Sequence, residues 1–319
     1  MIPKKTKLTA KDLRPIALTI YTYKIFMAIL KDKIEDHLRS NNETKESQAG
    51  FSKGARIEDN LFMLQFCIED SFCMGKPLIV TSIDYTKAFD SIKREKIVEA
   101  MIKYKIHPDI ISAIANIYKE DNTLIKVTNE RNTKVTVTSG IRQGCTGSTT
   151  LFKLITYLII NRMEEERGFG SVNINISGLF FADDGLLLSQ NVERAKHNIK
   201  LLTEISRDCG LEINKSKSNI LIYNMENQPE EIEGIQVTEE IKYLGITLTN
   251  SRNIFTKQKK LMIEKAQRMA NLAYSIIAKS CHKVTIGKAY WKNICLPSIL
   301  YGANIVNFTE AEICKLQAI

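Results

Sequence analysis

Three aspartates stand where strands of a folded chain would present metal ligands. Asp84 directly follows an apolar run of β-branched character, residues 78–83, while Asp183 and Asp184 lie between two short apolar segments. Nucleotidyl transfer needs little covalent help from a protein, but it needs two divalent cations that stabilise the attacking and leaving oxygens. Carboxylates are the hard oxygen ligands that Mg²⁺ prefers. If the strands are neighbours in one sheet, these distant carboxylates converge on such a site.

Each aspartate also has an ordinary structural interpretation. Gly185 follows Asp184, and Asp-Gly is a favoured dipeptide in type I′ hairpin turns. Asp84 could likewise be a polar residue at the end of a strand. The aspartates therefore have to be weighed together with the segments around them.

A glycine-bearing loop, residues 140–147, is the second region that could do chemistry. It lacks the Gly-Lys-Ser/Thr sequence of a phosphate-binding P-loop, which argues against an ATPase loop. Arg142 and Gln143 offer hydrogen-bond donors to a phosphate or a template base, and a solvated loop before a helix is the alternative. The lysines within residues 210–218 could give a proton to leaving pyrophosphate, contact backbone phosphates or lie on a solvated face.

Apolar periodicity predicts the elements that must position these residues. Spacings of three and four predict helices over residues 15–38, 58–74, 97–104, 108–117, 151–166, 192–209 and 257–279. A further helical piece is expected to end before Pro297. Short apolar or alternating segments predict strands at 78–83, 172–176 and 220–223, hairpins over 123–138 and 178–188, and a strand pair within 235–248. Strands and helices are mixed from 76 to 223, which predicts an α+β fold.

Length and charge indicate a folded, multi-part protein with a polyanionic partner. The 319 residues exceed the roughly 100 to 200 of one domain, so two or three sub-domains are expected. Lys and Arg outnumber Asp and Glu by 45 to 36, and the net charge of +9 favours phosphate contacts, with simple solubility as the alternative. The basic helix expected over residues 257–279 could follow a duplex or be a plain exposed face.

Other classes of protein are disfavoured. The seven cysteines include no CxxC pair, which argues against a zinc site or a disulfide framework and for a reducing compartment. The apolar stretch 151–160 is interrupted by Lys153 and is far shorter than the ~20 residues that cross a bilayer. The N-terminus has no apolar region of a secretory signal. We expect an intracellular protein, cytoplasmic or nuclear, without membrane contact.

Taken in order, the segments resemble the reverse transcriptases of non-LTR (LINE-type) retrotransposons. A group II intron-type or telomerase-like polymerase would share the central part, but residues 88–90 and 243–245 favour the retrotransposon type. The resemblance rests on seven ordered blocks over most of the chain: Arg14-Pro15-Ile16-Ala17-Leu18, Gln48-Ala49-Gly50-Phe51, the block from Ile83 to Asp90, the loop from Gly140 to Phe152, Phe181-Ala182-Asp183-Asp184, Leu211-Glu212-Ile213-Asn214 with Lys217, and Tyr243-Leu244-Gly245.

The resemblance implies a right-handed polymerase fold of the α+β class. Fingers are expected at residues 1–75, a mixed-sheet palm with inserted finger elements at 76–250, and a helical thumb at 251–319. The implied activity is RNA-directed DNA synthesis. Its partners would be an RNA template, a DNA primer and deoxynucleoside triphosphates, and its cofactor Mg²⁺ or Mn²⁺.

The resemblance also implies roles for individual residues. Phe89 matches the steric gate that excludes a ribose 2′-OH, and Lys217 would lie near the departing phosphates. The implied metal ligands are Asp84, Asp183, Asp184 and the backbone carbonyl of Tyr85. The implied nucleotide contacts are Arg14, Phe89 and Gln143, and the implied nucleic-acid contacts are Gln48, Phe51, Lys53 and Arg142.

The chain departs from the family pattern at several places. Thr146-Gly147-Ser148-Thr149 replaces Pro-Leu-Ser-Pro, so two prolines are missing, and Phe181 replaces the commoner tyrosine. No endonuclease, zinc-knuckle or ribonuclease H region is recognisable, and both ends look like parts of longer segments. We therefore expect a fragment or a decayed element, with an inactive nucleic-acid-binding remnant as the alternative to a working polymerase.

Overall fold

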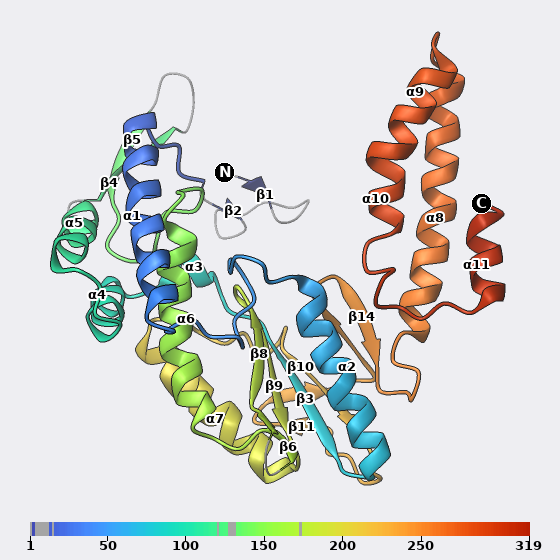
Figure 1. Cartoon of the computed structure of the whole chain (residues 1–319), viewed down its shortest axis with the longest axis horizontal. Helices are drawn as coiled ribbons and strands as arrows, with labels where there is room; N and C mark the ends of the chain where they lie inside the picture. The colour runs from blue at the N-terminus through green and yellow to red at the C-terminus, as the bar shows by residue number, and fades with distance from the viewer. Residues whose placement is uncertain (1, 4–12, 15, 120, 127–131, 172–173) are drawn as a thin grey trace.

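A six-stranded sheet runs through the middle of the molecule (Figure 1). The computed structural model describes residues 2–3, 13–14, 16–119, 121–126, 132–171 and 174–319. Neighbouring strands are antiparallel except β10 and β12, which are parallel. In spatial order the strands are β11 (Glu231–Ile232), β12 (Ile235–Val237), β10 (Asn219–Tyr223), β3 (Leu78–Ile83), β9 (Asp184–Ser189) and β8 (Gly178–Phe181).

Both faces of this sheet are buried, which explains its nearly continuous apolar strands. In β3, Ile79 and Ile83 join one apolar cluster, while Leu78 and Val80 join the cluster on the opposite face. Successive side chains of a strand point to opposite faces of the sheet, so the apolar residues of β3 divide between the two clusters. The predicted strand at 78–83 is therefore confirmed, and it forms part of two cores at once.

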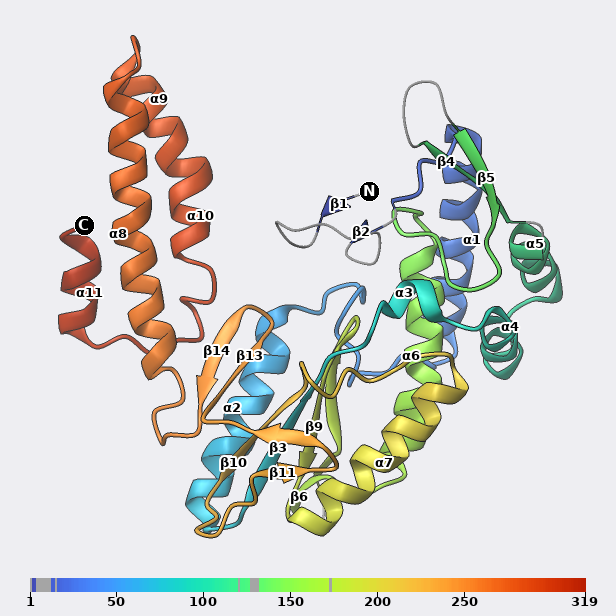
Figure 2. The ribbon, with the colours of Figure 1, turned by 180° about the vertical axis from the view of Figure 1, so that it is seen from behind.

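Helices cover both faces (Figures 1 and 2). One face packs against α6 (Ser148–Glu164) and α7 (Val192–Asp208), and the other against α2 (Ile57–Met74) and the hairpin of β13 (Glu240–Tyr243) and β14 (Ile246–Thr249). The helices α1 (Tyr21–Ser40), α3 (Ala88–Ser91), α4 (Arg94–Lys103) and α5 (Pro108–Lys119) add to the cluster on the first face, and the hairpin β6–β7 (Phe169–Ser171, Ile174–Ile176) adds to the second. Two further hairpins are β1–β2 (Ile2–Pro3, Leu13–Arg14) and β4–β5 (Asn122–Lys126, Asn132–Thr136).

The C-terminal helices project from the rest of the molecule (Figure 1). They share a small apolar cluster that includes Ala266, Ala273 and Cys295. In chain order they are α8 (Thr256–Ala278), α9 (Lys283–Tyr290), the π-helical turn η2 (Trp291–Cys295), α10 (Leu296–Ile299) and α11 (Glu310–Gln317). None of the helices in the described part of the chain has the length and apolar character needed to cross a membrane.

Most predicted elements are confirmed with small shifts of their ends, and two differ. The helix expected from residue 15 begins only at Tyr21, because the N–H of Ala17 donates to the carbonyl of Gln143 (2.8 Å) and residues 16–20 follow that loop instead. Pro15 lies outside the described residues. The last helical segment continues past Pro297, which lies in the first turn of α10, where a missing N–H is tolerated.

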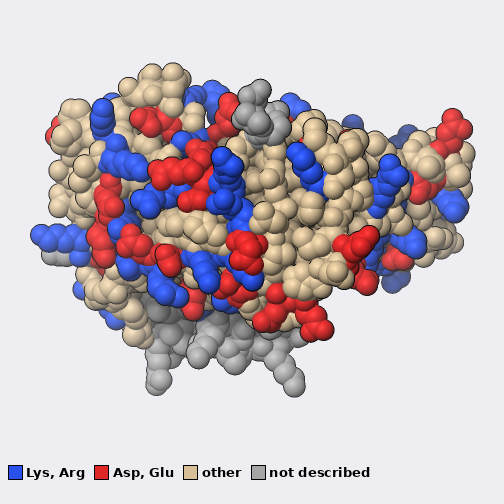
Figure 3. Space-filling view, turned by 90° about the horizontal axis from the view of Figure 1, so that it is seen from below, with Lys and Arg blue, Asp and Glu red and all other residues tan. Residues whose placement is uncertain are grey.

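Charges of both signs are interspersed on the face shown in Figure 3, toward the end of the molecule that carries α4 and α7. Lys96, for example, pairs with Glu99 and with Asp208. The net positive charge is therefore not gathered into one patch on this face, which does not favour it as a nucleic-acid surface.

A buried ion pair connects α1 to α6. The ammonium of Lys153 is 2.7 Å from both carboxylate oxygens of Glu35, and the Thr150 hydroxyl donates to the same carboxylate (2.7 Å). The Lys153 side chain is only 2% exposed. The lysine that interrupts the apolar run 151–160 is thus neutralised in the interior, where an unpaired charge would be costly.

We expect Lys153→Met to lower the free energy of unfolding by about 3 kcal/mol, because it leaves Glu35 without its cation inside the protein. Urea unfolding followed by circular dichroism measures the change. The control is Lys45→Met, since the pair of Lys45 with Glu164 (2.9 Å) is much more exposed, and its loss should cost less than about 1 kcal/mol. Equal losses in the two variants would contradict the assignment.

Candidate active site

The pairing of β3 with β9 brings the predicted aspartates to one edge of the sheet. Ile83 is paired with Gly185 in the antiparallel ladder, so the next position along the register places Asp84 opposite Asp184. The backbone N–H of Asp84 donates a hydrogen bond to the hydroxyl oxygen of Ser218 (3.1 Å), which holds this end of β3. The expectation that the two strands are neighbours in one sheet is confirmed.

A two-residue turn joins β8 to β9 and carries Asp183 at its tip. Phe181 pairs with Asp184 across the hairpin, which leaves Ala182 and Asp183 as the turn. Ala182 has a φ of 58°, a left-handed conformation that is uncommon outside glycine. The alternative interpretation of Asp184-Gly185 as the turn is wrong, because both residues belong to β9.

The ionisation of Asp184 is shifted by its surroundings at this edge. Burial, and to a lesser extent the negative charges of Asp183 and Asp84, raises the pKa of Asp184 to about 6. No described residue donates a hydrogen bond to the buried Oδ2 atom of Asp84. The ammonium of Lys217, 3.7 Å from that oxygen, is an ion-pair partner beyond hydrogen-bonding distance.

The chemistry of this donor set fits a hard divalent cation. Three carboxylates at one edge, one of them with a buried oxygen that lacks a hydrogen bond, create a negative potential that a cation would relieve. Among the residues that the structure describes, no three carboxylate, imidazole or thiol groups are drawn together tightly enough to enclose one ion. The three aspartates therefore lie along one edge of the sheet and do not surround a single point.

Phe89 lies in α3 within a group of three aromatic rings. It stacks on Phe152 with 4.5 Å between ring centroids, and its edge meets Phe51 at 6.5 Å. Tyr85, four residues earlier, directs its hydroxyl away from the sheet edge to Ser206 (3.0 Å). The ring of Phe89 is therefore held from two sides, while the side chain of Tyr85 belongs to the core.

Gln48 lies beneath the hairpin turn rather than on a surface. It is 1% exposed, and its amide is hydrogen-bonded to Ala182, Gly50 and Thr156. The prediction that Gln48 contacts nucleic acid is therefore corrected, because no part of the side chain is available to a strand. Phe51 and Lys53, in contrast, are exposed.

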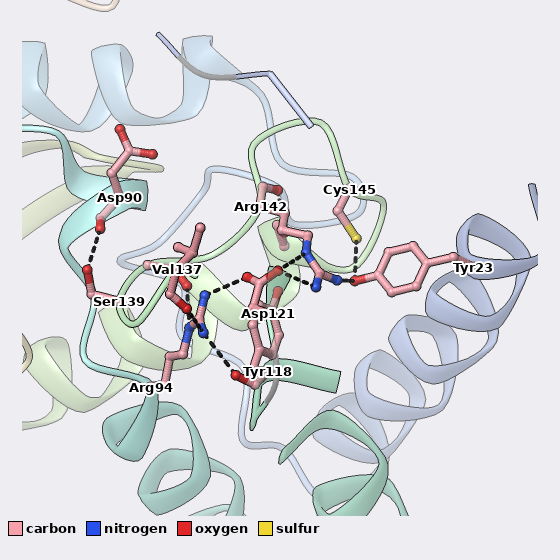
Figure 4. A network of polar contacts seen from close by, with 11 residues as sticks. Tyr23, Asp90, Arg94, Tyr118, Asp121, Val137, Ser139, Arg142 and Cys145 are labelled. Carbon is pink, nitrogen blue, oxygen red and sulfur yellow. Dashed lines mark hydrogen bonds and ion pairs between the residues drawn. The ribbon is translucent and has the colours of Figure 1, made fainter. Parts of the chain in front are cut away.

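Arg142 is also committed to an internal network, which Figure 4 shows. Its guanidinium donates to Asp121 (2.6 and 3.2 Å) and to the hydroxyl of Tyr23 (2.6 Å). Asp121, which is 2% exposed, also accepts from Arg94 at 2.7 Å. The predicted contact of Arg142 with nucleic acid stays a prediction, since the guanidinium is paired with Asp121 but its side chain is still 20% exposed. Sequence reasoning missed Asp121, since nothing in its polar surroundings separates it from an ordinary loop residue.

Gln143, next to this network, is held at the edge of a cavity. Its amide nitrogen donates to Asp90 (3.0 Å), and the Ser139 hydroxyl donates to the backbone carbonyl of Asp90 (3.3 Å; Figure 4 shows the latter contact). The cavity has a volume of about 390 Å³, and its lining includes Gln143, Asp90 and Lys87. The structure therefore keeps Gln143 near the sheet edge through α3.

Comparison with known proteins decides the family. The sequence profile of the reverse transcriptase (RNA-dependent DNA polymerase) family matches residues 2–248. The chain belongs to this family. Its relatives include a Pol polyprotein from a type-1 retrotransposable element R2 of Nasonia vitripennis, 24% identical over 86% of this chain and 29% of that protein. Another is a probable RNA-directed DNA polymerase from transposon BS of Drosophila melanogaster, which is 23% identical over 95% of this chain and 34% of that protein. The resemblance to non-LTR retrotransposon reverse transcriptases is thus confirmed.

A solved structure of apo telomerase from Candida tropicalis is similar in fold to this chain. It matches with a TM-score of 0.52 and 12% identity, over 93% of this chain and 52% of that chain. The expected α+β right-handed polymerase fold is confirmed. The chain spans about 29% of the R2 relative, so it corresponds to one part of that longer protein.

The loop that lacks two family prolines is held by side chains instead. The hydroxyl of Thr146 donates to the carbonyl of Lys24 (3.2 Å), and that of Ser148 to the carbonyl of Arg142 (2.7 Å). Ser148 is 2% exposed. These contacts join the loop to α1 and to the start of α6, so its position is defined without the stiffness of proline.

Part of the basic helix α8 serves attachment rather than binding. Lys257 pairs with Glu240 of β13, and Lys259, whose side chain is 7% exposed, pairs with Glu312 of α11 at 2.9 Å. Lys259 is therefore not free to follow a duplex, whereas Lys257 stays on the surface with its side chain 47% exposed. For Arg14, the structure describes the backbone in β2 and not the side chain.

We expect Asp184→Asn to make the metal-free protein more stable at pH 7 by about 1 kcal/mol. Because the pKa of Asp184 is raised to about 6 in the folded protein, folding carries a cost that grows as the pH rises from about 4 to about 6 and persists above it. Asparagine removes this charge, and solvent exposure of the residue keeps the gain below the full shift.

Urea unfolding in the presence of a chelator, at pH 4.5 and pH 7, measures this effect. The gain in stability should be smaller at pH 4.5, where Asp184 is mostly protonated in the folded protein. If the variant is less stable than the wild type at pH 7, or gains the same stability at both pH values, ionisation of Asp184 does not destabilise the folded protein.

Proposed function

We propose that this chain is an RNA-directed DNA polymerase that extends a DNA primer on an RNA template. Asp84, Asp183 and Asp184 would hold Mg²⁺ or Mn²⁺ in this reaction. The observation that carries the proposal is the β3–β9 register, which puts Asp84 opposite Asp184 and next to Asp183, together with the raised pKa of Asp184. Nucleotidyl transfer requires such a concentration of carboxylates.

The bound cations would neutralise charge on the triphosphate and favour ionisation of the primer hydroxyl. The tasks of the protein are binding and orientation. Lys217 would supply a proton or positive charge to the departing pyrophosphate, which its exposed ammonium 3.7 Å from Asp84 supports. The backbone carbonyl of Tyr85 would complete the ligand set.

The other proposed contacts belong to the nucleotide and the nucleic acid. Gln143 would position the incoming nucleotide, and its hydrogen bond to Asp90 supports a fixed orientation. Phe89 would select a deoxyribose, and Arg14 would contact the triphosphate. Phe51 and Lys53, both exposed, would contact the nucleic acid.

We further propose the division into fingers (1–75), palm (76–250) and thumb (251–319). The separate apolar cluster of the C-terminal helices supports a distinct last part. The chain spans about a third or less of the relatives R2 and BS.

Asp183→Ala should lower primer extension by at least about 1000-fold, because removal of a metal ligand abolishes charge stabilisation in the transition state. Incorporation of labelled dTTP on a poly-rA template with an oligo-dT primer and Mg²⁺ measures it. The matched control is Asp109→Ala, since Asp109 is a fully exposed aspartate in α5.

Three outcomes separate the possibilities. Activity in the wild type and the control, but not in Asp183→Ala, supports the polymerase. Activity that survives in Asp183→Ala excludes the proposed site. A folded wild type that binds primer-template in a salt-dependent manner without incorporation favours the inactive nucleic-acid-binding remnant.

Phe89→Ala should reduce discrimination against ribonucleotides by about tenfold to a hundredfold, because a ring that blocks the 2′-OH is removed. Single-nucleotide kcat/KM values for dTTP and UTP give the ratio. The control is Phe66→Ala, which removes an exposed ring from α2. Unchanged discrimination in Phe89→Ala, with normal dTTP incorporation, would contradict the role of steric gate.

A further inference from the structure

The amide of Gln48 is bonded to both backbone groups of the turn residue that precedes Asp183. The N–H of Ala182 donates to the Gln48 Oε1 atom (2.9 Å), and Nε2 donates to the carbonyl of Ala182 (3.2 Å). A side-chain amide that pairs with both groups of one residue fixes that peptide more firmly than a single hydrogen bond would.

Two further hydrogen bonds fix the amide itself. Oε1 accepts from the N–H of Gly50 (2.9 Å), and Nε2 donates to the hydroxyl oxygen of Thr156 in α6 (3.1 Å). The amide oxygen thus faces two donors and the nitrogen two acceptors. A flipped amide would set N–H against N–H, so only one orientation satisfies the buried group.

The turn needs such support because its backbone is unfavourable. Ala182 has a φ of 58°, which costs about 1 kcal/mol or more for a residue with a side chain. It lies directly before Asp183 and two residues before Asp184. A rotation of its peptide would therefore move the two carboxylates relative to Asp84.

The segment around Gln48 is itself attached to the hairpin. The N–H of Phe180 donates to the carbonyl of Ser47 (2.7 Å), and the N–H of Ala49 donates to the carbonyl of Phe180 (3.0 Å). Gly50 lies so close that a Cβ atom there would be 2.0 Å from the nitrogen of Ala182. Gln48 is therefore held in register with β8 and cannot withdraw without breaking these contacts.

We propose that Gln48 is a positioning residue of the cation site: its amide sets the backbone of Ala182 and so the places of Asp183 and Asp184. Gln48 touches neither the cation nor the nucleic acid. This inference rests on the proposed function, because it presupposes that these aspartates bind a divalent cation.

The test is the affinity of the whole chain for Mn²⁺ alone, measured by titration calorimetry without nucleotide or nucleic acid. Gln48→Met keeps the length of the side chain and removes all four hydrogen bonds. We expect Mn²⁺ binding to weaken about tenfold or more, the usual effect of losing a group that orients metal ligands. In primer extension, the half-saturating Mg²⁺ concentration should rise by a similar factor, with little change in KM for dTTP.

Thr156→Val is the matched control. It removes one partner of the same amide nitrogen and leaves both bonds to Ala182, so Mn²⁺ affinity should stay within about twofold of the wild type. If Gln48→Met does not fold, as judged by circular dichroism, Gln48→Asn replaces it, because the shorter amide keeps polarity in the buried site but withdraws from Ala182. The same weakening is expected.

The outcomes for the two proposals are distinct. If Asp183→Ala loses Mn²⁺ binding while the Gln48 variants bind as the wild type does, the positioning role is overturned and the proposed function stands. If the control weakens binding as much as Gln48→Met, the effect reflects general loosening of the interior, and the positioning role is likewise overturned. If the wild type binds no Mn²⁺, or Asp183→Ala binds it unchanged, the cation site itself is refuted, and the positioning role with it.

Discussion

The burial of Asp184, together with its repulsion by Asp183 and Asp84, is the constraint around which this protein is built. The register of β3 against β9 forces Asp84 and Asp184 to face each other, and the tip of the hairpin adds Asp183. Strands that were free to slide would relieve the repulsion by moving apart. They cannot, because β3 contributes to apolar cores on both faces of the sheet, and a slip of one residue would exchange its two sets of side chains.

The sheet edge and the loop beside it are further supported by polar groups that are buried or mostly buried. Gln48 fixes the turn from beneath, and on the other side the ion pairs of Asp121 with Arg94 and Arg142 secure the loop that carries Gln143. These groups resemble binding residues in sequence, since all are polar and three of them, Gln48, Asp121 and Arg142, lie outside helices. Their burial gives them a different task, which is to limit the positions available to the groups that meet a ligand.

The sequence predicted the elements and the converging aspartates well, for physical reasons that are easy to state. Burial on both faces makes strands such as β3 continuously apolar, and burial on one face gives helices such as α7 their spacing of three and four. The errors came where distant parts of the chain compete for the backbone. Residues 16–20 have helical spacing but bond to the loop at Gln143. The tasks of Gln48 and Arg142 depend on partners more than 20 residues away, which periodicity does not reveal.

The order of the strands also has a consequence for synthesis of the protein on the ribosome. β3 lies at the centre of the sheet, yet about a hundred residues separate it from β9, its first neighbour to be made, and β10 follows later still. At translation rates of roughly 5 to 20 residues per second, both hydrogen-bonding edges of this apolar strand wait several seconds for their partners. During that interval the nascent chain exposes a surface that favours aggregation, so the yield of folded protein should depend on chaperones that shield β3 until the hairpin has emerged.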